Sequence, residues 1–409
     1  MSKLQYRNVT KSTSIRTRCK SLTSIEQAKL RILKKCAMML MVKYRREKDD
    51  LLRRKVKRKI LLCINLSVGI QLDTYEPIER PVRMNISLEN MTFMFSKEFL
   101  RFRKEDITDL YVLLRFPDKV RLENRSTMSG EEVFMRGLYE LCTGAKKTIV
   151  SEIFGRHPSD RCRAFNYFIS HIYNNFHHLV TDNLPWWFHC GFMERSAIAI
   201  EEKLGARYDD RFATFIDCNC LRTDRPGGGP QEDGPGAQRW PNDVQRAFYN
   251  GWKSIHGLKH QTVDNALGFT IDVFGPVPLR GNDMSLFRDS NINQRMAELG
   301  EYKIFGDSAY RGGNHSHCAS YGTDPVFNSQ MKSVRISIEW NYMTTVSLFP
   351  FFGMEHKFEV FESSGVARIY IVATLFKNFH ALYGNLTMNY FGVILPDGFL
   401  QAYINGVII

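Results

Sequence analysis

The sequence predicts an α/β fold in which a mixed five-stranded sheet is flanked by helices and preceded by a helical N-terminal region. Two observations favour this class. From about residue 195, apolar strand-like runs alternate with helical segments, and two of the runs end at an Asp. The hydrophobic fraction of 44% and the aromatic fraction of 12% suit a globular chain, and 409 residues suffice for two or three domains.

The excess of positive over negative charge is confined to the N-terminal end of the chain. Residues 1–60 carry 20 Lys and Arg against 4 Asp and Glu, whereas the remaining residues carry 36 against 39. Residues 24–60 are predicted to be helical, beginning at a Ser24 cap and ending in the cluster RRKVKRK. We therefore predict a basic helical arm over residues 1–70, which favours a polyanion such as nucleic acid. A nuclear import signal and a solvated helix that packs on a neighbour are the alternatives.

Membrane insertion and secretion are not indicated. No apolar run reaches the roughly 18 residues that a transmembrane helix needs, and the N-terminus has no hydrophobic signal segment. The nine cysteines are scattered and odd in number, which is typical of reduced thiols. We expect a protein of the nucleus, present also in the cytoplasm, with no membrane partner.

Residues 71–190 are predicted to be a helical region with the outline of a helix-turn-helix. A helix over 130–144 and a short helix over 145–155, each ended by Gly, precede a long helix over 156–180. The start of the long helix is where such folds meet DNA, so three of its residues are predicted DNA contacts: Ser159, Arg161 and Arg163. A plain helical subdomain whose arginines face water is the alternative.

Residues 195–390 are predicted to form the α/β domain itself. A helix over 195–207 leads to the strand of Asp217, a hairpin near Asn265, a helix over 283–300, the strand of Asp307 and a helix around Glu339. This order is that of ribonuclease H-like folds. The Gly/Pro-rich segment 225–241 lacks the Gly-Lys-Ser/Thr ending of a P-loop, so we predict a flexible insertion. A last amphipathic helix over 364–384 precedes a tail, 391–409, that we expect to be loosely packed.

Three acidic residues are candidates for one site: Asp217, Asp307 and Glu339. A carboxylate at the end of a buried strand is costly unless a positive partner neutralises it. Three converging carboxylates would provide the oxygen ligands that Mg²⁺ or Mn²⁺ prefers. Two such ions suit phosphodiester hydrolysis. The structural alternative is that Asp307 is a turn residue and Glu339 a charge on a helix surface.

Several short segments together resemble those of one family. They are Ile216-Asp217, RPGG at 225–228, Gln245 to Lys253, Gly257-Leu258-Lys259, GDSAYRG at 306–312 and Ser333 to Trp340. With them the chain resembles Harbinger-type DDE transposases, including the nuclease-like proteins derived from such enzymes, over about residues 130–390. The acids are 90 and 32 positions apart, and the combined pattern is more specific than any one segment.

The resemblance implies roles for individual residues. Asp217, Asp307 and Glu339 would be catalytic and would bind two divalent cations during hydrolysis and strand transfer of DNA. Four basic residues would line the DNA path, and three further residues would be auxiliary. The basic residues are Arg225, Lys253, His256 and Lys259, and the auxiliary ones are Asp283, Ser333 and Arg335. The family also implies a Myb-like partner protein and a dimer or higher oligomer.

The chain departs from the family at several positions. Asn282 stands where relatives carry His before Asp283, and Cys218-Asn219-Cys220 follows Asp217 where Gly is common. A catalytically silent DNA-binding protein descended from such an enzyme is therefore the main alternative, with a metal-dependent RNA hydrolase as a third hypothesis. A zinc site is disfavoured because its candidate ligands lack the C-x-x-C spacing; they are Cys218, Cys220, His315, His317 and Cys318.

Overall fold

The computed structural model describes residues 24–46, 52, 54–63, 86–156, 158–226, 242–311, 315–352, 365–384 and 386–408. The chain divides into two compact units, Met1–Arg80 and Pro81–Ile409. Among the described residues, no helix combines the length and apolar character that crossing a membrane requires.

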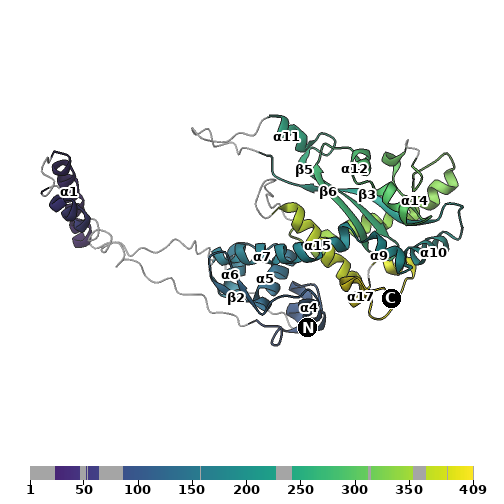
Figure 1. Cartoon of the computed structure of the whole chain (residues 1–409), viewed down its shortest axis with the longest axis horizontal. Helices are drawn as coiled ribbons and strands as arrows, with labels where there is room; N and C mark the ends of the chain where they lie inside the picture. Colours follow the sequence, from purple (N-terminus) through teal and green to yellow (C-terminus); the bar gives the residue numbers. More distant parts are fainter. Residues whose placement is uncertain are drawn as a thin grey trace, which may run out of the picture. The chain divides into compact units, whose positions relative to one another are not determined.

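The first unit contains helix α1 (Ser24–Arg46), drawn in purple in Figure 1. A further helical stretch covers residues 54–63. The helix predicted over 24–60 is thus present over most of that range. Large hydrophobic side chains of α1, such as Met38 and Met39, are more than 60% exposed.

The second unit begins with the predicted helical region. Its elements are α3 (Phe93–Phe99), α4 (Lys104–Leu113), the hairpin β1 (Lys119–Arg121) and β2 (Thr127–Ser129), α5 (Gly130–Thr143), α6 (Lys147–Phe154) and α7 (Pro158–Phe176). Ser129 caps α5 by accepting a hydrogen bond from the Glu132 amide at 3.2 Å. Gly144 and Gly155 end α5 and α6 with φ of 57° and 62°, which a residue without Cβ adopts at little cost. The three predicted helices are present, whereas the β1–β2 hairpin was not predicted.

Arginine–carboxylate pairs join α5 to α7 and to the turn between them. Glu132 contacts Arg156 at 2.7 Å and the fully buried Arg136 at 3.2 Å, and Glu140 contacts Arg161 at 2.9 Å. The expectation for Arg161 needs correction here, because its buried guanidinium binds Glu140 and the Ala145 carbonyl instead of standing at the surface.

A six-stranded mixed sheet forms the centre of the α/β region. Its strands are β3 (Phe212–Arg222), β4 (Tyr249–Asn250), β5 (Ile255–Asn265), β6 (Thr270–Pro278), β7 (Lys303–Phe305) and β8 (Cys318–Ala319). The order is β4-β5-β3-β7-β8, with β6 also paired to β5. β5 is antiparallel to β3 and β6, while β3, β7 and β8 are parallel. The predicted α/β class with a mixed sheet is confirmed, with the two-residue β4 as the additional strand.

Helices cover both faces of this sheet. On one face, Gln261 of β5 donates to Ser290 at the end of α12 (Asp283–Asp289), which is followed by α13 (Ile292–Leu299). On the other face, the neighbouring Thr262 bonds to Tyr342 of α14 (Pro325–Leu348), and His260 stacks on Tyr370 of α15 (Val366–Ala381). Figure 1 shows α12 and α15 on opposite sides of the strands. The alternation of side chains along β5 therefore assigns each helix to its face.

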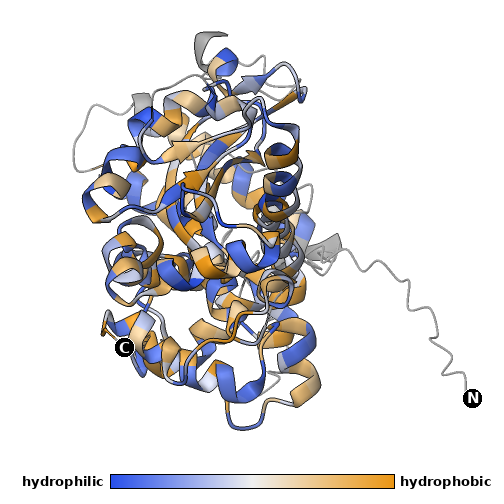
Figure 2. Ribbon diagram, turned by 90° about the vertical axis from the view of Figure 1, so that its right-hand side faces the viewer, coloured by the Kyte–Doolittle hydropathy of each residue, from blue (hydrophilic) through white to orange (hydrophobic). Residues whose placement is uncertain are grey.

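The segment after α7 and the tail are both packed in the core. The connector after α7 forms α8 (His178–Thr181) and α9 (Leu184–His189), which lead into α10 (Phe192–Leu204). The tail forms α16 (Leu386–Phe391) and α17 (Phe399–Asn405), and the buried Tyr403 packs its ring 5.6 Å from that of Trp187. The expectation of a loosely packed tail is wrong, because aromatic residues of α17 fill a space beside α9. In Figure 2 the hydrophobic residues run through the strands and the helices that border them.

Two element predictions differ from the structure, and a third lies mostly outside the described residues. The predicted helix over 283–300 is two helices, since Asn291 takes a positive φ of 51° between α12 and α13. The helix predicted over 364–384 is α15, which is buried nearly all round instead of amphipathic. Most of the Gly/Pro-rich segment 225–241 lies outside the described residues.

Candidate active site

Asp217 lies in the middle of β3, not at its end as predicted. The strand continues to Arg222 because residues 218–222 pair with the first residues of β5, and Asp217 itself stands opposite Thr262. Successive residues of a strand point to opposite faces, so Asp217 shares its face with Thr262 and thus with α14.

Asp307 lies at the same level of the sheet as Asp217. β7 runs parallel to β3 with Phe305 beside Phe215, and each Asp follows two residues later. β7 ends before Asp307, whose carboxylate accepts a hydrogen bond from the Ala309 amide at 2.9 Å and caps the single helical turn Ser308–Tyr310. The Asp is therefore held in place by the turn that it caps.

Glu339 reaches this site through Arg335, which stands one helical turn earlier on α14. Arg335 contacts Asp217 Oδ2 with Nη1 at 3.3 Å and Glu339 Oε1 with Nη2 at 2.9 Å. Its Nε donates to Tyr321 Oη at 3.2 Å, so the guanidinium has a partner on each side. The sequence spacing of four residues puts Arg335 and Glu339 on one helix face, and the fold directs that face at Asp217.

The acids influence one another electrostatically. Burial, with smaller contributions from the charges of Asp307 and Asp283, raises the pKa of Asp217 to about 6. The Cys218 amide and Arg335 oppose the shift by stabilising the carboxylate. A raised pKa indicates that the protein alone stabilises the ionised form of this carboxylate poorly, and a bound cation would stabilise it.

Asp283 adds a fourth carboxylate beside the site, on the other face of β3. It is the first residue of α12 and contacts Lys259 Nζ at 2.7 Å. Lys259 also donates to the Gly281 carbonyl at 2.7 Å and is buried. Asn282 caps α12 by accepting from the Ser285 amide at 2.7 Å.

The cysteines and histidines considered for zinc are separated. Cys218 lies 3.5 Å from the Tyr310 hydroxyl and Cys220 lies 3.3 Å from Lys253 Nζ, on the face of β3 opposite Asp217. The His315 ring packs on Phe287, 4.7 Å between centroids. Among the described residues, no three His, Cys, Asp or Glu side chains are grouped closely enough to hold a metal ion, and this covers the acid site as well.

The remaining predicted residues lie in different surroundings. Arg225 is exposed and binds the Gln245 side chain at 2.6 Å and 2.9 Å. The His256 ring packs on that of Tyr249, and burial together with Arg225 lowers the pKa of His256. Ser333 donates to the Gln330 carbonyl at 2.7 Å on α14. In the helical region, Ser159 lies in the first turn of α7, and Arg163 is half-buried in the same helix.

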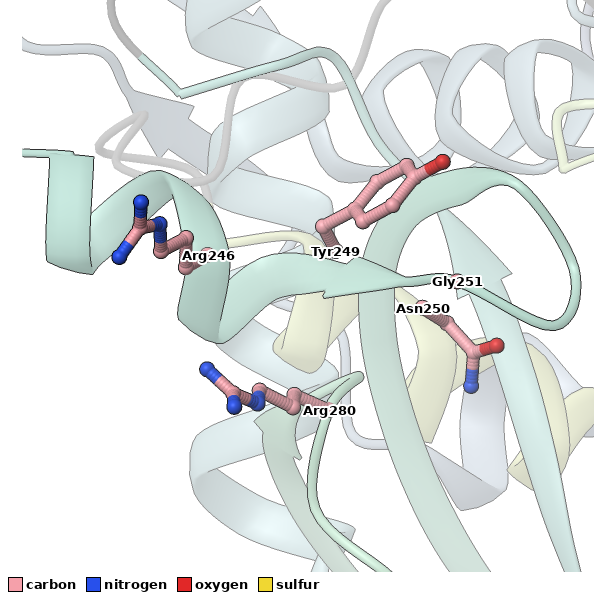
Figure 3. Close-up of a pocket in the computed structure, with 5 residues that line it drawn as sticks. All are labelled: Arg246, Tyr249, Asn250, Gly251 and Arg280. Carbon is pink, nitrogen blue, oxygen red and sulfur yellow. The ribbon is translucent and has the colours of Figure 1, made fainter.

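Sequence reasoning missed several residues beside the acids. Tyr342, three residues after Glu339 on α14, binds Thr262 at 2.6 Å, and its position on the Arg335 face could have been found from helical spacing. Arg246 and Arg280 line a pocket of about 480 Å³ with Tyr249, Asn250 and Gly251. Figure 3 shows both guanidinium groups extending to the same side. Arg246 stands within the quoted 245–253 segment, whereas no signal marked Arg280.

Comparison with protein families gave one match, to the family model described as DDE superfamily endonuclease, over residues 235–378. The matched range contains Asp307, Glu339 and most of the sheet, and it begins after Asp217. Comparisons with curated proteins and with solved structures gave no significant match. The match and the mixed α/β architecture indicate a transposase-like nuclease domain.

Proposed function

We propose that the chain is a DDE-type endonuclease of the Harbinger group, which hydrolyses DNA phosphodiesters with divalent cations and transfers strands. The observation that carries the proposal is the meeting of Asp217 and Asp307 at one level of parallel strands, with Glu339 joined to Asp217 through Arg335. The DDE family match over 235–378 supports the same chemistry.

A ribonuclease H-like topology is the finer fold proposal. Along the sheet the strands run β6-β5-β3-β7-β8, which in chain order is third, second, first, fourth and fifth. Only β5 runs against β3, β6, β7 and β8. Asp217 lies on the first strand, and Asp307 lies two residues after the end of the fourth. This order supports an arrangement in which the carboxylates of the central strands face the last helix of the motif, α14.

The donor set fits hard divalent cations in its chemistry. Asp217, Asp307 and Glu339 offer only carboxylate oxygens, the ligands that Mg²⁺ and Mn²⁺ prefer. A positive group, Arg335, already bonds two of the three. These three acids would hold the ions, and bound ions would activate the attacking water and stabilise the leaving oxygen.

The protein's own groups would orient the acids. Arg335 fixes one oxygen each of Asp217 and Glu339, and Tyr321 in turn fixes Arg335. The Asp307 cap holds its carboxylate on the turn after β7. A scissile phosphate that approaches this edge would meet the guanidinium of Arg335, which could move from the carboxylates to the phosphate oxygens as cations bind, since it forms planar paired contacts with either.

DNA contacts, partners and location complete the proposal. The basic arm over 1–70 would supply salt-dependent affinity, and a helix-turn-helix formed by α5, α6 and α7 would meet DNA through Ser159 and Arg163 at the start of α7. We further propose a nuclear protein that acts with a Myb-like partner and as a dimer or higher oligomer, because strand transfer engages two DNA ends.

A catalytically silent DNA-binding protein is the second candidate, and a specific observation favours it. Arg335 lies between two of the three acids, and the described residues contain no carboxylate group already arranged around an ion. If Arg335 keeps this place permanently, the acid site serves as a structural ion pair and the arm and helical region retain DNA binding alone.

Nicking of supercoiled plasmid DNA separates the two candidates. The wild-type chain in Mg²⁺ or Mn²⁺ should nick DNA, EDTA should abolish the nicking, and Asp217→Asn should abolish it in metal. A chain that binds DNA at low salt and leaves it intact in both metals would establish the silent form. Cleavage of RNA and not of DNA would identify the third hypothesis, an RNA hydrolase.

A further inference from the structure

Three pockets adjoin one another along the rim of the sheet and form one trough. The first, of about 370 Å³, is lined by Arg225, Gln245, Arg246, Tyr249 and His256. The second, of about 480 Å³, shares Arg246 and Tyr249 with it, and the third, of about 490 Å³, shares Asn250 and Arg280 with the second. The shared residues make the trough continuous from Arg225 to Asp283 and Ala309.

The trough ends beside Asp307, one of the three acids. Ala309 lines its far end, and the Ala309 amide donates to Asp307 at 2.9 Å. Asp283, at the same end, is paired with Lys259. A chain lying in the trough would therefore pass from Arg225, by way of Arg246 and Arg280, to the edge of the carboxylates.

The charge of the trough is positive away from the acids. Arg225, Arg246 and Arg280 are exposed, and among the lining residues that the structure describes, Asp283 is the one carboxylate. Figure 3 shows Arg246 on the helix before β4 and Arg280 after β6, with their guanidinium groups on one side of the pocket. Guanidinium groups spaced along a groove suit successive phosphates of a nucleic-acid backbone.

An exposed tryptophan stands at the rim. Trp252 follows Gly251 of the second pocket in the turn between β4 and β5, and it is 95% exposed. The turn is fixed, because the Lys253 amide donates to the Asn250 side chain at 2.9 Å and β4 pairs with the start of β5. An indole that the fold holds in water beside a cationic groove is a platform on which a base can stack.

We propose that this trough binds a single DNA strand next to the scissile phosphate, with its phosphates on Arg246 and Arg280 and an unpaired base stacked on Trp252. DNA as the polyanion rests on the proposed function, whereas the trough and its residues stand on their own geometry. A single strand is favoured over a duplex because Trp252 offers a flat surface for a base face, which paired bases do not expose.

Photo-crosslinking of the full-length protein tests the proposal locally, so that binding by the basic arm does not obscure the result. Single-stranded oligonucleotides carrying 5-iododeoxyuridine are irradiated with the protein in EDTA, and crosslinked peptides are mapped. We expect a crosslink at Trp252, and a yield about tenfold lower in the double variant Arg246→Gln/Arg280→Gln. Arg207→Gln, which removes a charge from a side chain that is 71% exposed elsewhere, should leave the yield unchanged.

Trp252→Ala provides a variant that cannot fail through folding, since its side chain makes almost no core contact. It should weaken binding of a single strand about tenfold at moderate salt and leave duplex binding unchanged. Any one of three results would overturn the proposal. They are crosslinks that map only to residues other than Trp252, an unchanged crosslinking yield in the double variant, and equal crosslinking of a duplex at Trp252. Because the measurement is made in EDTA, a chain that fails to cleave DNA can still show the crosslink, and failure of the trough is thereby distinguished from failure of the proposed function.

Discussion

Two clusters of charged side chains in this protein use the same pairing of arginine with carboxylate and differ in balance. Between α5 and α7, Arg136, Arg156 and Arg161 meet Glu132 and Glu140, and the charge of Asp160 acts on the first two arginines. Around β3 the carboxylates are in excess. Four carboxylates there stand against two cations, Arg335 and Lys259. The carboxylates are Asp217, Asp307, Glu339 and Asp283.

The difference shows what each cluster is for. A balanced, buried cluster satisfies its own charges and ties helices together, although its desolvation cost limits the net stability that it provides. In the acid-rich cluster the carboxylates outnumber the cations, four to two. Under the proposed function this excess of negative charge would attract an external cation, whereas the first cluster joins helices.

The largest expected effect follows from removing a carboxylate of the acid-rich cluster. Asp217→Asn should lower metal-dependent nicking by on the order of 10³-fold, because the lost charge would act directly on the ions at the reacting phosphate. Initial rates of plasmid nicking in Mn²⁺ measure it. The exposed Asp209→Asn is the matched control, and an equal loss there would show that the change in rate has another origin.

Breaking the balanced cluster should affect stability and not chemistry at the phosphate. Glu132→Ala leaves Arg136 buried without its nearest carboxylate, and we expect the free energy of unfolding to fall by about 3–5 kcal/mol. Urea unfolding followed by circular dichroism measures this. Glu339→Gln, whose side chain is 53% exposed, should change stability by less than about 1 kcal/mol. Equal losses would remove the distinction between the two clusters.

Arg335→Gln sharpens the comparison, because it removes the cation that the acid-rich cluster already has. In EDTA the variant should be less stable by about 1–3 kcal/mol, since Asp217 and Glu339 lose their shared donor. Mn²⁺ should then raise the melting temperature of the variant more than that of the wild type. A variant on which Mn²⁺ has no effect would favour a permanent ion pair and the silent form.

The smallest effect concerns pH. The pKa of Asp217 is raised to about 6, so in EDTA its contribution to stability is full below about pH 4 and is lost as pH rises through 6. The part lost between pH 5 and 8 should be no more than about 2 kcal/mol. Stabilisation by Mn²⁺ should run the other way and grow as the carboxylate ionises. Thermal unfolding from pH 5 to 8 with and without Mn²⁺ measures both. Asp217→Asn should flatten both profiles, and unaltered profiles in this variant would assign them to another group.

Local patterns predicted most elements of the second unit. The glycines at 144 and 155 marked the ends of α5 and α6, and the apolar runs marked β3, the β5–β6 hairpin and β7. The short β1, β2, β4 and β8 were missed, because strands of two or three residues carry too little periodicity to detect. Trp187 lies in the short helix α9 and Tyr403 in the tail helix α17, yet their rings pack together. Aromatic residues in short helices become buried only through partners that are distant in the chain.

For the site, residue types and context nominated Asp217, Asp307 and Glu339, and the resemblance to a family added Arg335 as an auxiliary residue. Spacing could not predict that Arg161 and Lys259 are buried in ion pairs. The sequence around a positive residue does not indicate whether its side chain will contact water or a carboxylate. Nor could it link Arg246 to Arg280, which are 34 positions apart and line one pocket.

The sequence by itself determined where most of the longer helices and strands lie, which residues are acidic or basic, and which short segments resemble a known family, since these depend on neighbours along the chain. The tertiary structure alone decided that Asp307 stands level with Asp217, that one arginine joins two of the acids, and that three pockets form one trough. Strand register and helix placement bring those groups together, and both arise from packing between residues that are far apart in the chain.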